Sequence, residues 1–245
     1  MSTRWIRLAA TALLAVALVG CNSKVEKLDN YDGLEANQTV GILPINAQPR
    51  VSAQVYNNTL AFAGTAGRIA VTKADDSTRR KMTEQLEQER YDYRQEVKAD
   101  LLARIEAQGY NAEFMDFKRS IDNVLEAVPP GRFEKRYPKD SGYDFLLDIY
   151  VDYFGYAARN LTSQYLPTAH VAIRVVDGRS LETLYQSEIQ YNPTDDRDGV
   201  IRVDSNPEFG YDNVDDLLED VPRAKDGLRE ATDAVLDVII RELTS

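Results

Sequence analysis

Apolar positions along residues 76–108 recur with the spacing of an amphipathic helix. They return at intervals of four or seven residues, between charged and amide side chains: Met82, Leu86, Tyr93, Val97, Leu101 and Ile105. This stripe predicts one long helix with a single buried face. Ser77 supplies a capping residue near its start, and Gly109 suits a left-handed stop. A second stripe predicts a helix after Pro222: Leu228, Ala231, Val235, Leu236, Ile239 and Leu243.

A period of two replaces the helical period in residues 143–154, which predicts a strand with one face inward and one outward. Val171 to Val175 repeats this alternation, Asp177-Gly178 predicts a hairpin turn, and residues 181–191 form the returning strand. Earlier in the chain, the apolar run 39–45 predicts a buried first strand, and two shorter segments complete the pattern: a strand at 111–118 and a helix at 120–128.

The order of these elements is β-α-β-α-β-β-β-α, which predicts the α/β (α+β) class. Helices packed mainly on one face of a mixed β-sheet would bury both the helical stripes and the inward strand faces. We expect a single domain over residues 38–245, because no internal repeat or second linker divides this stretch. The uncharged segment 51–67 is predicted to be an ordinary part of that domain rather than an oligomer- or membrane-contacting hairpin.

The amino terminus carries the pattern of an export signal. Arg4 and Arg7 precede a short uncharged run, Leu8 to Val19, which is shorter than the roughly 20 residues that span a bilayer. The run ends in Leu18-Val19-Gly20-Cys21, which resembles the bacterial lipobox. The resemblance implies a lipoprotein signal peptide over 1–20, cleavage between Gly20 and Cys21, and lipidation of Cys21, which includes palmitate.

Lipidation would also account for the lone cysteine, because an exported free thiol is prone to oxidation. Cys21 and the polar residues up to 37 are expected to form a lipidated, flexible tether. Asn22 follows the cysteine, and by resemblance to enteric lipoproteins this favours the periplasmic face of the outer membrane over the inner membrane.

The mature domain resembles periplasmic α/β lipoproteins of three kinds: the curli-secretion lipoproteins, the lipoprotein activators of penicillin-binding proteins, and the amino-terminal domain of the Tol-system propeller protein. The stretches that carry the resemblance are Asp100 to Tyr110, leading into a strand, and Val171 to Ile189, a hairpin. The likeness is one of architecture, and it carries no functional residue across.

The acidic net charge of the chain argues against nucleic acid and an anionic lipid surface as partners. The net charge is −11, and removal of residues 1–20 leaves 27 basic against 40 acidic residues, a net charge of −13. A nucleic-acid partner is therefore not expected. An acidic domain is also repelled by anionic lipid, so we expect it to be tethered to the membrane rather than laid flat on it.

Few residues in the chain suggest catalysis or cofactor binding, and no cofactor is predicted. One histidine and one cysteine exclude a Cys/His zinc cluster. His170 has no nucleophile elbow to serve, so no catalytic residue is predicted. The acidic loop with Asp195, Asp196 and Asp198 is a candidate calcium site, although it departs from the EF-hand pattern at positions one and twelve.

A partner surface is the remaining candidate. Asp148, Tyr150, Asp152 and Phe154 are predicted to share the outward face of one strand, and Tyr is favoured where a surface is half dry and half wet. Asp148 and Asp152 would lie ~13 Å apart, too far for a retaining pair of catalytic acids.

The sequence thus favours a non-enzymatic, lipid-anchored accessory or scaffold lipoprotein. Its partner would be another envelope protein or further copies of itself. Two alternatives stay open: an envelope hydrolase that uses paired carboxylates, and a lipoprotein that binds calcium or a small ligand.

Overall fold

The structure is a computed structural model, and it describes residues 26–27, 31, 33–47, 51–57, 77–119, 133–194 and 197–245. The predicted signal peptide, Cys21, the second half of segment 51–67 and the predicted helix 120–128 lie outside the described residues.

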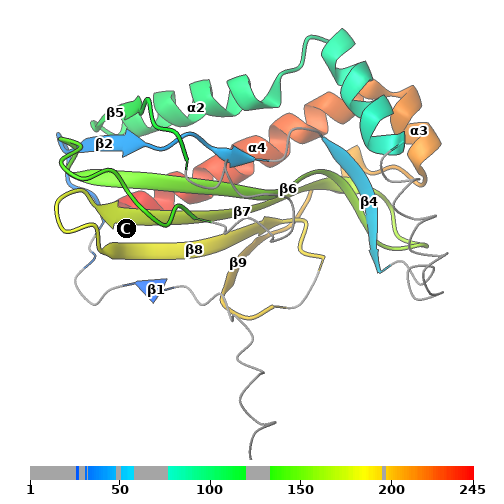
Figure 1. Ribbon diagram of the computed structural model, residues 1–245. Coiled ribbons are helices and arrows are strands. Elements are labelled where there is room, and N and C mark those ends of the chain that lie inside the picture. Colours follow the sequence, from blue (N-terminus) through cyan, green and yellow to red (C-terminus); the bar gives the residue numbers. More distant parts are fainter. Residues whose placement is uncertain are drawn as a thin grey trace, which may run out of the picture.

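A mixed sheet forms the centre of the described structure (Figure 1). Its main path runs β1-β8-β7-β6-β2-β5, while β3 and β4 pair with β6, and β9 pairs with β8. β6, β7 and β8 are successive antiparallel neighbours, whereas β2, β3 and β4 all run parallel to β6. The strands are β1 Glu26–Lys27, β2 Thr39–Ile42, β3 Asn46–Ala47, β4 Ser52–Asn57, β5 Asn111–Phe114, β6 Phe145–Asn160, β7 Leu166–Asp177, β8 Thr183–Tyr191 and β9 Val200–Val203.

The long helices cover one face of this sheet, as predicted. α2 (Tyr93–Ala107) and α4 (Val221–Thr244) run along the same side in Figure 1, and the short α3 (Val214–Glu219) precedes α4. All six residues of the predicted stripe on α4 are buried. The α/β class with helices on one face of a mixed sheet is therefore confirmed.

The predicted long helix is two helices. Residues 77–88 are helical, residues 89–92 are not, and α2 begins at Tyr93. Arg90 has a left-handed backbone (φ 56°) and donates to the Glu87 carbonyl, while Tyr91 donates to the Leu86 carbonyl. This is the Schellman arrangement that ends a helix, here without glycine. Asp92 then caps α2 by accepting from two backbone N–H groups.

A β-bulge in β6 changes which side chains face the helices. The pairing of β6 with β7 shifts register between Val151 and Tyr153. Residues up to Val151 obey one alternation, and beyond the bulge Phe154 belongs to the core under the helices. Because one extra residue reverses the faces, the prediction that Phe154 shares the outward face with Asp148 is wrong.

The core has two unequal parts. The larger lies between the helices and the sheet and includes both helical stripes. The smaller lies on the opposite face, where Leu43, Leu146 and Val176 are fully buried under Met115, Phe117, Tyr137, Tyr143 and Leu181. This face is therefore not the plain polar outer face that the alternation in residues 143–154 predicts.

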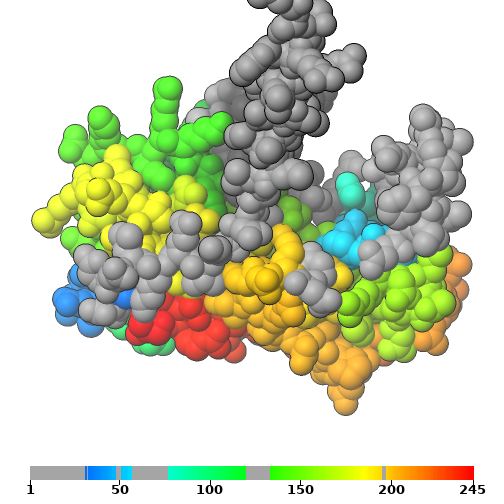
Figure 2. Space-filling model, turned by 90° about the horizontal axis from the view of Figure 1, so that it is seen from below, coloured from blue at the N-terminus to red at the C-terminus, as the bar shows by residue number. Residues whose placement is uncertain are grey.

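Several elements were not predicted from the sequence. β4 occupies the start of the uncharged segment 51–67, and burial of Val51 and Ala53 agrees with an ordinary part of the fold. β9 lies within residues 192–213, the acidic segment with Asp198 that was expected to be a loop, and it is on the side of the molecule that Figure 2 shows. Two residues of the predicted tether, Tyr31 and Leu34, are buried in the larger core, so that part of the segment packs on the domain. None of the helices described here is long and apolar enough to cross a membrane.

Gly155 is needed where β4 pairs with β6, opposite Ser52. Its φ is +151°, and a Cβ there would lie 1.9 Å from the Ser52 carbonyl oxygen. We predict that Gly155→Ala lowers the free energy of unfolding by about 3 kcal/mol, because it adds a backbone clash to an unfavourable φ. Urea unfolding measures the change.

Gly142→Ala is the matched control. Gly142 also has a positive φ (+82°), but no atom of the described residues lies within 4 Å of the added Cβ. We expect a loss of only about 1 kcal/mol, from the φ preference alone. Equal losses in the two variants would contradict the role assigned to the β4–β6 contact.

Candidate binding site

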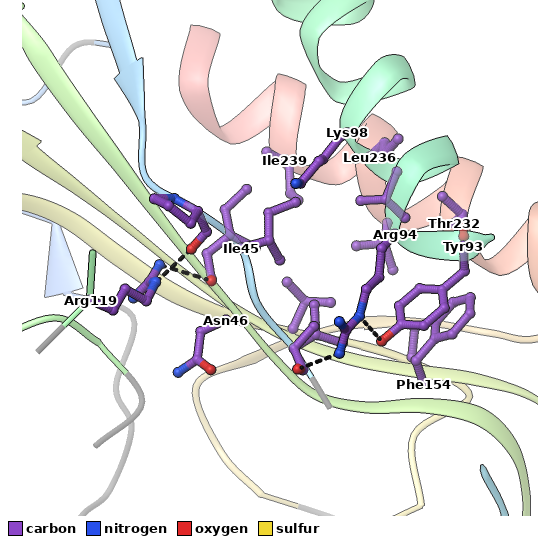
Figure 3. A pocket seen from close by; sticks show the side chains of 18 residues that line it. Ile45, Asn46, Tyr93, Arg94, Lys98, Arg119, Phe154, Thr232, Leu236 and Ile239 are labelled. Carbon is purple, nitrogen blue, oxygen red and sulfur yellow. Dashed lines mark hydrogen bonds between the residues drawn. The ribbon is translucent and has the colours of Figure 1, made fainter. Parts of the chain in front are cut away.

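A pocket of about 320 Å³ lies between the helices and the sheet (Figure 3). α2 and α4 form its upper side, and β6, β7 and the chain from Pro44 to Ala47 form the rest. Its volume falls at the lower end of the range for small-molecule sites, ~300–1,000 Å³. Most of its wall is apolar: Ile45, Val97, Ile149, Val151, Phe154, Ala169, Val171, Val235, Leu236 and Ile239.

Along α2, the pocket lies between two fully packed ends of the helix. Leu101 and Ile105 are fully buried in the larger core. At the other end, the Tyr93 ring stacks on the Phe154 ring, with centroids 4.7 Å apart. Val97, midway along the same stripe, is only half-buried and faces the pocket. Burial raises the pKa of Tyr93, so its hydroxyl stays protonated at neutral pH.

Two cations of α2 stand beside the pocket. Arg94 and Lys98 are one helical turn apart, and both belong to its lining. Arg94 donates to the Ala47 carbonyl at 3.3 Å and to the Tyr93 hydroxyl at 3.5 Å. Lys98 lies over the Phe114 ring, 5.7 Å from its centroid. Within the described part of the chain, neither side chain forms an ion pair with a carboxylate.

A third basic side chain, Arg119, closes the opposite end of the pocket. Its Nε donates to the Pro44 carbonyl at 2.5 Å, and its Nη2 donates to the Ile149 carbonyl at 3.5 Å. Pro44 lies between β2 and β3 and has no N–H of its own. Arg119 therefore occupies the interruption in the hydrogen-bond ladder between these strands and β6.

Asp148 balances the charge of Arg119 from the other face of the sheet. Its side chain is fully buried, and Oδ1 accepts from Arg119 Nη2 at 2.5 Å. Oδ2 accepts from the Glu134 backbone N–H at 2.7 Å and from the Tyr137 hydroxyl at 3.0 Å. Burial, and next the Asp148 charge, raise the pKa of Tyr137. The prediction of Asp148 as part of an outward partner surface is therefore wrong.

The remaining residues of the predicted partner surface do not form one surface, because Phe154 lies away from Tyr150 and Asp152. Tyr150 and Asp152 are half-buried, and the Tyr150 hydroxyl donates to Asp152 Oδ1 at 3.2 Å. Phe154 instead forms part of the pocket wall. His170 lies inside β7 and is buried against Tyr56, whose hydroxyl oxygen is 3.2 Å from His170 Nδ1.

The predicted calcium loop is described only in part. Asp198 is exposed, whereas Asp195 and Asp196 lie outside the described residues, as do Gly20 and Cys21. Among the residues that the structure describes, no three His, Cys, Asp or Glu side chains come together as a metal site.

Sequence reasoning did not find the pocket or its cations. Arg94 and Lys98 each follow a residue of the apolar stripe, Tyr93 and Val97, and this adjacency was the available signal. Arg119 gave no comparable signal, because its partner Asp148 is 29 residues away in the chain.

Three solved structures align with this chain, each at a low TM-score. A Xanthomonas campestris protein of family DUF330 has a TM-score of 0.42 at 10% identity, over 89% of this chain and 88% of that chain. Lipoprotein GNA1162 of Neisseria meningitidis has a TM-score of 0.29 at 16% identity, over 62% and 81%. A neuraminyllactose-binding hemagglutinin homologue of Helicobacter pylori has a TM-score of 0.32 at 8% identity, over 90% and 91%.

No protein-family model matches the chain, and no curated protein matches it. The three structural likenesses are distant, and no conclusion about function depends on them.

The ion pair beneath the pocket is expected to support the fold. We predict that Asp148→Asn lowers the free energy of unfolding by about 3 kcal/mol, because it leaves the Arg119 charge buried and unbalanced. Denaturant unfolding provides the measurement.

Asp152→Asn removes a carboxylate from the same strand at a half-buried position. We expect it to cost less than about 1 kcal/mol. If Asp148→Asn were as mild as this control, the ion pair would not be a main support of the sheet.

Proposed function

We propose that this chain is a lipid-anchored lipoprotein of the bacterial envelope whose domain acts by binding rather than by catalysis. The observation that carries the proposal is that two features occur together in one chain. One is the lipobox ending in Cys21; the other is an apolar, cation-edged pocket in the domain that follows.

Anchoring at Cys21 follows from the amino-terminal pattern. Each buried methylene contributes ~0.8 kcal/mol, and stable attachment takes more than one acyl chain. A triply acylated Cys21 would therefore hold the domain at a membrane. The acidic domain would stand off from anionic lipid. Asn22 supports the periplasmic face of the outer membrane as the location.

The lining of the pocket supports binding. General acid–base hydrolysis with paired carboxylates needs two acids in one cleft. The described lining contains apolar side chains, amide and hydroxyl groups and three cations, but no carboxylate and no histidine. This composition suits recognition of a mainly apolar molecule with few polar groups. An accessory role with an envelope protein, or self-assembly, is compatible with this binding role.

Labelling with palmitate tests the anchor. We expect the wild-type chain to incorporate label, to begin at Cys21 and to sediment with membranes. Cys21→Ser should remain unlabelled, because it removes the only thiol that can be lipidated. A wild-type chain that stays unlabelled and leaves with the soluble fraction would contradict the anchor.

Asn22→Asp tests the location within the envelope. We expect this variant to be labelled as strongly as wild type but to move from the outer- to the inner-membrane fraction on a sucrose gradient. An unchanged distribution would contradict the assignment of the outer membrane by the residue after Cys21.

A further inference from the structure

We propose that the pocket between α2, α4 and the sheet binds a single acyl chain whose anionic head group lies between Arg94 and Lys98. The inference rests on the proposed binding role of the domain but not on the lipid anchor, since it concerns residues 44–239 alone.

The shape and lining of the pocket argue for one chain. About 320 Å³ is a small site, and its interior is formed by aliphatic and aromatic side chains of β6, β7 and α4. Figure 3 shows Ile45, Leu236 and Ile239 between the Arg119 end and the Tyr93–Phe154 end. An apolar ligand gains free energy there in proportion to the area it removes from water.

The charges argue for an anionic head group. The whole chain carries 40 acidic residues against 29 basic ones, yet the lining that the structure describes holds three basic residues and no acidic one. Asp148 already balances Arg119. Arg94 and Lys98 have no carboxylate partner among the described residues, so their charges are available to an anion.

The exposure of Arg94 and Lys98 indicates where the head group lies. Arg94 is exposed and Lys98 is half-buried, so both can meet a head group that stays partly in water. In Figure 3, Lys98 extends from α2 toward the side of the pocket where Ile45 and Ile239 lie. At the far end, Arg119 Nη1 and Asn46 Nδ2 are buried donors without a hydrogen-bond partner among the described residues. These two donors are able to hold a water molecule, but they add no net charge, because Asp148 balances the charge of Arg119.

Calorimetric titration of the purified protein at low salt tests the proposal. The probes are dodecanoate and the neutral dodecanol, both below the concentrations at which they aggregate. We expect dodecanoate to bind one per chain and more tightly than dodecanol. Arg94→Gln and Lys98→Gln should each weaken dodecanoate binding about fivefold and leave dodecanol binding unchanged.

Two further variants serve as controls. Lys81→Gln removes one exposed positive charge from helix 77–88, outside the pocket, and should not change either affinity. Val97→Trp fills the pocket from α2 and should weaken both probes at least tenfold, provided that its circular dichroism and Tm match those of wild type. If the charge variants and Lys81→Gln weaken dodecanoate equally, or if no probe saturates, the proposal is overturned.

The position of the head group has its own test. If Asn46→Ala weakens dodecanoate while Lys98→Gln does not, the head group lies at the Arg119 end and the assignment is wrong. A titration with lauroyl lysophosphatidylglycerol distinguishes the two sources of the acyl chain. If it binds more tightly than dodecanoate, the ligand is a lipid; if it binds more weakly, the ligand is a free fatty acid. Failure of every probe would leave the palmitate result untouched, so the two proposals fail separately.

Discussion

The buried ion pair between Arg119 and Asp148 connects the pocket with the opposite face of the sheet. The β2 and β3 strands both pair with β6, but the chain between them contains Pro44 and cannot continue the ladder. The Arg119 guanidinium fills this interruption by donating to carbonyls on both sides. A buried cation is tolerated only with a paired and hydrogen-bonded anion. Asp148 supplies that anion, and Glu134 and Tyr137 complete its hydrogen bonds.

This arrangement couples the two faces of the sheet. On the second face, Arg174 extends the network by donating to the Tyr137 hydroxyl, and it stacks 4.2 Å from the centroid of the Phe133 ring. On the first face, the same Arg119 forms one end of the pocket. The segment from Glu134 to Tyr137, which holds Asp148 by hydrogen bonds, therefore helps to support the pocket, although it lies on the opposite side of the sheet.

The pocket is also a local exception to the charge of the molecule. An acidic surface discourages anionic ligands at long range. The approach of Arg94 and Lys98 to an apolar wall creates a small region of opposite sign. Their carbon stems can line the pocket while their charges remain near water. Such a combination selects for a molecule that is apolar along its length and negative at one end.

The sequence by itself determined the layer arrangement, because the period of the apolar residues directly fixes which face of each helix and strand is buried. The α4 stripe, the Asp177-Gly178 hairpin and the β6–β7–β8 order follow from it. It also supplied the amino-terminal pattern on which the proposed anchor rests.

Only the tertiary structure decided the rest. The helix break at Arg90 depends on a left-handed residue that is not glycine, and the β6 bulge reversed the face of Phe154 after seven correctly alternating positions. The pocket arises between α2, α4 and the sheet, and Arg119 meets Asp148 from a distant segment. The helix break is local, but its left-handed residue is not the glycine that would have marked it in the sequence. The bulge, the pocket and the ion pair depend on contacts between residues far apart in the chain, and a local pattern of apolar and polar positions carries no information about such contacts.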